Sequence, residues 1–170
     1  LGIADALILP CDVTDAASIA AAHARLHATW QGMDLAIYLA GDYVPMLAAD
    51  VDLARAEQVV AVNFNGAMKL VASVLPHLQV GHGIAFVASV AGYRGLPKAA
   101  AYGPTKAALI NFAETLYLDL APRGVSVFLI NPGFVATPMT AANDFAMPAL
   151  LSPSQAAEET LTSMEEMAAS

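Results

Sequence analysis

Residues 83–89, GIAFVAS, form an unbroken apolar run that ends in one hydroxyl group, Ser89. A strand with one face in water alternates apolar and polar residues, whereas a strand buried on both faces is apolar throughout. This stretch therefore predicts an interior strand of a parallel sheet that is covered by helices on both sides.

The flanking sequence repeats this pattern. We expect apolar strands at 6–11, 34–41, 83–89 and 125–131, and helices within 12–31, over about 52–78 and 101–121, and from 153 onward. Thr14 or Asp15 would cap the first helix, and Ser152 the last. Strands that alternate with helices predict an α/β fold, an open doubly wound parallel sheet with helices on both faces. The 170 residues are expected to form one domain over 1–170.

The composition narrows the classes of function. Hydrophobic residues make up 58% of the chain and charged residues 13%, which is typical of a globular protein with a large core. The net charge of -8 leaves no basic stripe for nucleic acid, so we expect no such partner. Apolar runs are broken well short of the roughly 18 residues of a membrane span, so we expect none and a cytoplasmic protein.

Metal binding has weak support in the sequence. Cys11 is the one cysteine, so neither an internal disulfide nor a cysteine-rich zinc site can form. His23 and His27 are four residues apart and could clasp a metal, but no acidic third ligand lies in register. A solvated helix face is the favoured interpretation, and no metal site is predicted.

The distinctive residues cluster where the predicted strands end. Asp12, Gly41, Ser89 and the Asn-Pro-Gly of 131–133 each follow a strand. In doubly wound sheets, ligands bind in the crevice beyond the carboxyl ends of the strands. We therefore expect the functional site at this edge.

Residues 99–109, AAAYGPTKAAL, carry the most informative pair of side chains. Pro104 is tolerated only in the first turn of a helix, which places Tyr102 at or just before the helix start. Lys106 lies four residues on and shares its face. The helix dipole and the Lys106 cation would lower the pKa of the Tyr102 phenol, which could then act as an acid or a base. Taken alone, the pair is more often a helix-end tyrosine beside a solvated lysine.

Two further polar residues could join this pair. Ser89 could donate a hydrogen bond to a carbonyl oxygen, or it could be an ordinary turn serine. Asn63, within VNFNG, lies on the apolar face of the long helix, where its amide needs a partner. It could bond a broken turn of its own helix.

Together these motifs resemble those of one known family. The matching residues are Asn63, Ser89, Tyr102 with Lys106, and Pro132-Gly133 with Thr137 four residues beyond the glycine. Their order and spacing resemble the short-chain dehydrogenase/reductase family, whose fold is a Rossmann-type doubly wound sheet. The resemblance runs from about residue 6 to 161.

The resemblance implies catalytic roles. Tyr102 would pass a proton to or from the substrate oxygen while hydride moves between the nicotinamide and the substrate carbon. Ser89 would bond the substrate carbonyl or alcohol, Lys106 would hold the nicotinamide ribose and lower the pKa of the phenol, and Asn63 would position a water in a proton relay to Lys106.

The resemblance also implies NAD or NADP as cofactor, without deciding between them. Besides Tyr102 and Lys106, its contacts would be Asp12 and Val13 at the adenine ring, Ala40 and Gly41 at the adenine ribose, Pro132 and Gly133 along the nicotinamide, and Thr137 near the carboxamide or diphosphate.

The sequence departs from the family pattern in two places. Tyr38 and Leu39 stand where the family has two asparagines before Ala-Gly, which removes amides that brace the central strands. The family's glycine-rich phosphate loop does not occur, and the sequence opens where the third strand of the full fold would begin. We therefore expect a domain truncated at the N-terminus that lacks its first βαβ unit, with a hole in the sheet between 6–11 and 34–41.

These features predict an NAD(P)-dependent oxidoreductase acting on an apolar carbonyl compound or secondary alcohol. An apolar lid would cover the substrate, formed by 134–151 with Phe134, Val135, Met139, Phe145, Met147, Leu150 and Leu151. The alternative is a catalytically silent dinucleotide sensor or scaffold. A serine hydrolase is disfavoured because Ser89 lacks the Gly-x-Ser-x-Gly context.

The helices suggest self-association. Leu116 and Leu120 are expected on the side of the 101–121 helix that faces away from the sheet, where they would pack on a second copy. The family resemblance also implies a homodimer or homotetramer.

Overall fold

The computed structural model describes residues 6–142 and 147–168. Its sheet has three parallel strands in the spatial order β1 (Leu35–Tyr38), β2 (Gly83–Val87) and β3 (Ser126–Ile130). These are three of the four strands that the sequence predicts, and their order is that of consecutive strands in one half of a doubly wound sheet.

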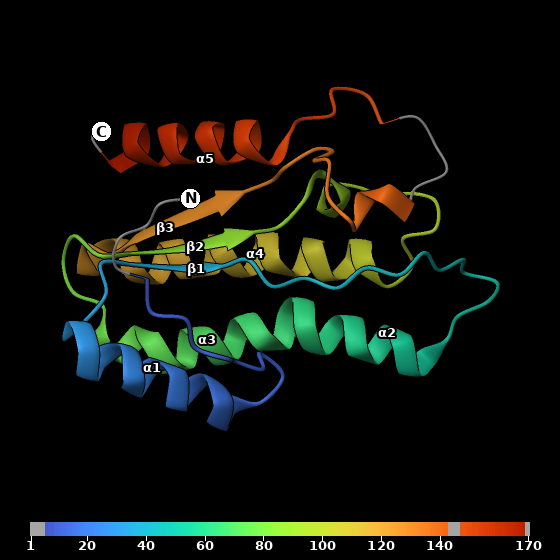
Figure 1. Ribbon diagram of the computed structural model, residues 1–170. Helices are drawn as coiled ribbons and strands as arrows, with labels where there is room; N and C mark the ends of the chain where they lie inside the picture. The colour runs from blue at the N-terminus through green and yellow to red at the C-terminus, as the bar shows by residue number, and fades with distance from the viewer. Residues whose placement is uncertain (1–5, 143–146, 169–170) are drawn as a thin grey trace.

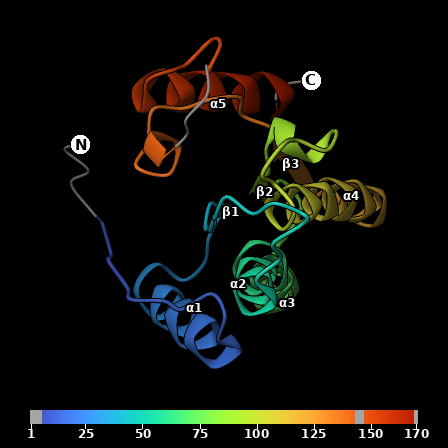
Figure 2. The ribbon, with the colours of Figure 1, turned by 90° about the vertical axis from the view of Figure 1, so that its right-hand side faces the viewer.

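Helices cover both faces of the sheet (Figures 1 and 2). One side carries α1 (Ala16–Trp30), α2 (Leu53–Val60), α3 (Gly66–Val74) and α4 (Tyr102–Leu120), and the other carries α5 (Pro153–Ala168). α4 packs along β3, and α3 along β1. The predicted α/β architecture is therefore confirmed.

The predicted caps explain where two helices begin. The Asp15 carboxylate accepts a hydrogen bond from the Ala17 amide, at 2.9 Å, at the start of α1. At α5, the Ser152 hydroxyl accepts from the Gln155 amide at 3.2 Å, and the Gln155 side chain accepts from the Ser152 amide at 2.9 Å. This reciprocal pair is a capping box, which satisfies two amides that the helix itself leaves without partners.

The core forms where the sequence is most apolar. β2 is buried along most of its length, and Ile84 and Phe86 are at most 1% exposed. Leu116 and Leu120 of α4 belong to the same core and are 7% and 3% exposed. The expectation that they face away from the sheet is wrong, because they continue the stripe begun by Leu109 at helical spacing.

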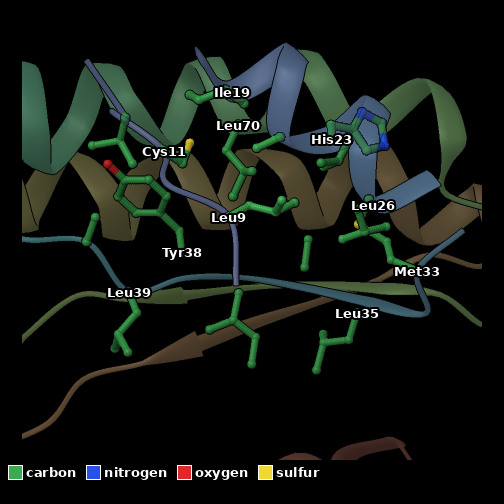
Figure 3. A pocket seen from close by; sticks show the side chains of 16 residues that line it. Leu9, Cys11, Ile19, His23, Leu26, Met33, Leu35, Tyr38, Leu39 and Leu70 are labelled. Atoms are coloured by element: carbon green, nitrogen blue, oxygen red, sulfur yellow. The ribbon is translucent and has the colours of Figure 1, made fainter. Parts of the chain in front are cut away.

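The first predicted strand is also wrong. Residues 6–12 have no regular secondary structure and make no ladder with β1. An apolar cavity of about 430 Å³ separates this segment from β1 and extends under α1 (Figure 3). A parallel strand needs a neighbour about 4.8 Å away to form hydrogen bonds, and at this cavity the described residues supply none, so residues 6–12 stay outside the sheet.

The long helix expected over 52–78 is continuous but changes its winding. Between α2 and α3, residues Ala61–Asn65 form a π-helical turn, and Leu75–His77 close the helix as a 3₁₀ turn. By length and composition, Leu53–His77 could cross a membrane, although no apolar run in the sequence is long enough to predict a span. Val59, Val71 and Val74 are buried against other elements of the described chain, as in a core helix, so this is weak evidence for a span.

Candidate active site

Segments from all three strands meet at the carboxyl edge of the sheet. The turn after β2 carries Ser89. The amide of Val90, the next residue, donates a hydrogen bond at 3.2 Å to the carbonyl of Pro132, which follows β3. A Cβ on Gly92 would lie 2.8 Å from the backbone carbon of Lys106. Glycine is therefore required at 92 if the turn is to pack against α4 and bring Ser89 beside its first residues.

Tyr102 and Lys106 are neighbours, as the sequence predicts. Tyr102 is the first residue of α4, and the Lys106 ammonium lies over its ring, 5.5 Å from the centroid. Lys106 is 4% exposed and donates a hydrogen bond to the Val87 carbonyl at 2.9 Å. Burial lowers the pKa of Lys106 to about 8.

The pKa of Tyr102 moves opposite to the prediction. Burial of the phenol raises its pKa, a hydrogen bond between the Ser89 and Tyr102 side chains lowers it, and the nearby Tyr43 raises it. Burial is the largest of these three effects, so the pKa is raised overall. In this structure Tyr102 is therefore a protonated phenol at neutral pH.

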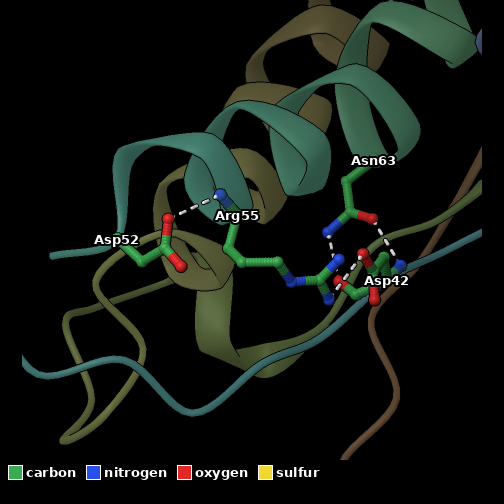
Figure 4. Close-up of polar contacts among 4 residues, drawn as sticks. All are labelled: Asp42, Asp52, Arg55 and Asn63. Atoms are coloured by element: carbon green, nitrogen blue, oxygen red, sulfur yellow. Dashed lines mark hydrogen bonds and ion pairs between the residues drawn. The ribbon is translucent and has the colours of Figure 1, made fainter.

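Asn63 joins the site through its side chain. It is fully buried within the π-helical turn. Its amide oxygen accepts from the Asp42 amide at 2.7 Å, and its amide nitrogen donates to the Asp42 carbonyl at 2.9 Å (Figure 4). The same amide nitrogen also donates to the Thr105 hydroxyl at 3.0 Å. The Thr105 hydroxyl in turn donates to the Tyr102 carbonyl at 2.7 Å.

This network shows that one expectation from the sequence, that Asn63 bonds a broken turn of its own helix, is wrong. The side chain does not bond its own helix. It ties the loop after β1 to the first turn of α4, the turn that carries Tyr102. A Cβ on Gly41 would lie 3.8 Å from both the Asn63 amide oxygen and the Lys106 ammonium, so these three residues meet.

The loop after β1 is also held from α2. Arg55 forms an ion pair with the Asp42 carboxylate at 3.4 Å. Asp52 caps α2 by accepting from the Arg55 amide at 3.1 Å (Figure 4). Asp42 is thus fixed by its backbone and its side chain.

Tyr38 occupies one of the two positions where the family pattern has asparagine. Its side chain is 2% exposed, and its hydroxyl donates a hydrogen bond to the Val62 carbonyl in the π-helical turn. The brace between β1 and the long helix is therefore made by a phenol. Leu39, at the second position, is 71% exposed and takes no part in it.

Comparison with known proteins agrees with this geometry. The family model of short chain dehydrogenases matches residues 3–147. The chain belongs to the short-chain dehydrogenase family. An uncharacterized oxidoreductase of Myxococcus xanthus is 37% identical over 150 residues, which cover 86% of this chain and 59% of that protein. An uncharacterized oxidoreductase of Staphylococcus epidermidis is 34% identical over 116 residues, which cover 50% of its length. The chain thus spans between half and three fifths of these relatives.

Solved structures of short-chain dehydrogenases share the fold. A dehydrogenase/reductase from Sinorhizobium meliloti superimposes with a TM-score of 0.82 at 26% identity, covering 90% of this chain and 65% of that one. A short chain dehydrogenase from Burkholderia cenocepacia, in complex with NADP, superimposes with a TM-score of 0.80 at 24% identity, covering 88% and 65%. The parallel sheet described above is therefore the Rossmann fold of this family.

The positions expected to contact a cofactor fall into two groups. Gly41, Pro132 and Gly133 lie at the carboxyl edge with the Tyr102–Lys106 pair. Val13 and Ala40 line the apolar cavity between α1 and β1.

The two remaining positions expected to contact the cofactor, Asp12 and Thr137, form hydrogen bonds within local turns. The exposed Asp12 carboxylate accepts from the Thr14 amide and hydroxyl, each at 2.8 Å, and these bonds lower its pKa. Thr137 belongs to a turn with Thr140, whose hydroxyl accepts a hydrogen bond from the Thr137 amide at 3.0 Å. Phe145 of the expected lid lies outside the described residues.

Sequence reasoning missed several supporting residues. Thr105 and Asp42 complete the Asn63 network, and Tyr43 packs on Tyr102 at a ring-centroid distance of 5.1 Å. These residues lie close together because the loop after β1 returns to α4, and the local sequence pattern does not predict that path.

His77 lies beside the His23 and His27 pair, with its ring 4.7 Å from that of His23. Among the described residues, no group of three such side chains has metal-binding geometry.

Proposed function

We propose that the protein is an NAD(P)-dependent oxidoreductase that interconverts a carbonyl compound and a secondary alcohol, with Tyr102 as the general acid or base. The observation that carries the proposal is the convergence of Ser89, Tyr102 and Lys106 at the carboxyl edge of the sheet. Family membership supports it, since the three side chains occupy the family's catalytic positions.

The protonation states favour Tyr102 as a proton donor. Burial keeps the Tyr102 phenol protonated at neutral pH, so it can deliver a proton to the oxygen of a carbonyl substrate that is being reduced. Ser89 holds the same oxygen by a hydrogen bond. Lys106, with a pKa of about 8, is charged at neutral pH and stabilises negative charge that develops on the phenol.

The residues present fit the nicotinamide end of a dinucleotide. An ammonium has three donor hydrogens, and the bond to the Val87 carbonyl uses one, which leaves donors at Lys106 for ribose hydroxyls. Among the described residues, the buried side-chain oxygen of Asn131, beside Pro132, has no hydrogen-bond partner and can accept from a ligand amide. No atom of the described chain lies within 4 Å of where a Cβ on Gly133 would be, so the backbone there is open to a flat ring.

When bound, the nicotinamide supplies or accepts the hydride. Lys106 orients its ribose, and Gly41 and Gly133 allow close backbone approach. The NADP in the Burkholderia neighbour shows that the fold accommodates such a cofactor in that protein. Asp12, Val13, Ala40 and Thr137 are proposed contacts along the rest of the dinucleotide, and NAD and NADP are both compatible with them.

The composition of the sequence supports a proposal for the substrate. The stretch 134–151 is rich in apolar residues, and we propose that it contributes to a substrate site that favours an apolar ketone or alcohol. Leu118 of α4 is 72% exposed and supplies an apolar contact for a homodimer or homotetramer. We propose a cytoplasmic enzyme in which residues 1–170 form a single dinucleotide-binding unit.

A catalytically silent dinucleotide sensor is the second candidate. The change to Tyr38 and Leu39, where the family pattern has two asparagines, favours it. The experiment incubates the intact protein with NADH or NADPH and with butan-2-one, cyclohexanone or acetophenone, and follows loss of nicotinamide absorbance. Turnover of any ketone supports the enzyme. Quenching of protein fluorescence by the cofactor, without turnover of any ketone, favours the sensor.

A further inference from the structure

The aromatic ring of Tyr43 packs directly against the ring of Tyr102. The two centroids are 5.1 Å apart and the ring planes meet at 76°, an edge-to-face contact. Both side chains are partly buried. Such contacts have a preferred geometry, so each ring restricts the orientation of the other.

Tyr43 is in turn fixed by its neighbour in the chain. The backbone of Asp42 is bonded on both sides by the Asn63 amide, at 2.7 and 2.9 Å, and its carboxylate is paired with Arg55 at 3.4 Å. A loop residue next to such a clamp has little freedom, because its own amide plane is set by the clamped residue. The backbone that carries Tyr43 is therefore held in place, and its ring is restricted by the contact with Tyr102.

The same clamp reaches Tyr102 from its backbone side. Asn63 donates to the Thr105 hydroxyl, which donates to the Tyr102 carbonyl at 2.7 Å. The buried side-chain amide of Asn63 thus bonds to both the loop that carries Tyr43 and the helical turn that carries Tyr102. The relative position of the two rings depends on this shared link.

We propose that Tyr43 is a positioning residue that holds the Tyr102 ring in the orientation required for proton transfer, with Asn63 fixing both tyrosines. This proposal rests on the proposed function for its catalytic consequence. The ring contact itself can be tested without activity. The aromatic ring of Tyr43, rather than its hydroxyl, makes this contact, so Tyr43→Phe should preserve the effect and Tyr43→Ala should abolish it.

The structural test uses the intact protein labelled with ¹³C in the tyrosine rings. The Tyr102 signal is identified by its loss in Tyr102→Phe. In Tyr43→Ala this signal should move, because the ring current of Tyr43 is removed, whereas in Tyr43→Phe it should stay near its original position. Tyr117→Ala is the matched control, since Tyr117 lies on the same helix and is 57% exposed. A Tyr102 signal that does not move in Tyr43→Ala overturns the proposal.

The kinetic test uses whichever ketone of the panel the unmutated protein reduces. Tyr43→Ala should lower kcat about tenfold with little change in the KM for cofactor, since misorientation affects proton transfer, and Tyr43→Phe should restore kcat. Equal losses of kcat in the Ala and Phe variants contradict a positioning role for the ring. If the unmutated protein reduces no ketone, the proposed function fails, while the NMR comparison still decides whether Tyr43 orients Tyr102.

Discussion

The Tyr38 hydroxyl donates a hydrogen bond to the Val62 carbonyl and so joins β1 to the π-helical turn that contains Asn63. A π turn shifts the helical bonding pattern by one residue, which exposes backbone carbonyls to other partners. Gly66 lies beside this bond, since a Cβ there would collide with the Tyr38 hydroxyl. The phenol, the π turn and the glycine form one unit.

Tyr38→Phe should lower the free energy of unfolding by about 1–3 kcal/mol, because the Val62 carbonyl loses its buried donor. Urea unfolding measures the change. Gly66→Ala should be strongly destabilising in the unmutated protein and better tolerated in the Tyr38→Phe background, where the hydroxyl is gone. Additive effects of the two substitutions would contradict a direct contact.

Asn63→Leu should lower the free energy of unfolding by about 2–4 kcal/mol, since the Asp42 amide and carbonyl would be left buried without their partner. Asn65→Leu, two residues away on the exposed face of the same segment, is the matched control and should change stability little. Thermal unfolding of both variants compares them. A similar loss in the two would show that helix propensity, rather than the amide network, accounts for the effect.

Lys106→Met should stabilise the protein at pH 7 while it removes activity. Burial lowers the folded-state pKa of Lys106 to about 8 from 10.5, so below pH 8 the chain holds a charge that folding partly desolvates. The unfolded chain binds more protons between pH 8 and 10.5, so this group makes stability rise with pH in that window. Lys106→Met should raise Tm by a few degrees at pH 7 and flatten that rise.

Lys69→Met on α3 is the control for this prediction and should leave the pH dependence of Tm unchanged. A rise of Tm with pH that persists in Lys106→Met would contradict the assignment to Lys106.

His23 should make the protein less stable in mild acid. Burial, followed by the neighbouring His77 and His27, lowers its pKa below 6.5. A base with a lowered folded pKa contributes stability above its unfolded pKa and loses it as the pH falls, because the unfolded chain binds the proton more readily. Tm should therefore fall below about pH 6.5, and His23→Gln should reduce that fall. His82→Gln is the control, and equal effects of both variants would contradict the role of His23.

The sequence predicted the architecture best where burial alone decides it. The apolar run of β2 and the alternation of strands and helices were sufficient for the α/β class, and Asp15 and Ser152 were sufficient for two helix starts. Residues 6–11 have the same apolar character but form no strand, because strand formation depends on a neighbour that local sequence does not specify.

The positions of the candidate catalytic residues were predictable from the sequence, but their surroundings in the fold were not. Ser89, Tyr102 and Lys106 were recognised from spacing, and the structure brings them together. The direction of the Tyr102 pKa was wrong, because a sequence shows which charges are near in the chain but does not show how deeply a phenol is buried. Asn63 bonds to Asp42, and Tyr102 contacts Tyr43, because the loop after β1 returns to α4. The spacing of apolar residues in a sequence does not predict the path of such a loop.

Substitution of Tyr102 tests the central claim most directly. In the intact protein, Tyr102→Phe should keep its affinity for the cofactor, measured by fluorescence quenching, and lose about 10²–10⁴-fold in kcat for ketone reduction, because the proton donor is removed. Tyr117→Phe, on the exposed face of the same helix, should keep the kcat of the unmutated protein. A Tyr102→Phe variant that reduces the ketone at the unmutated rate would contradict the account.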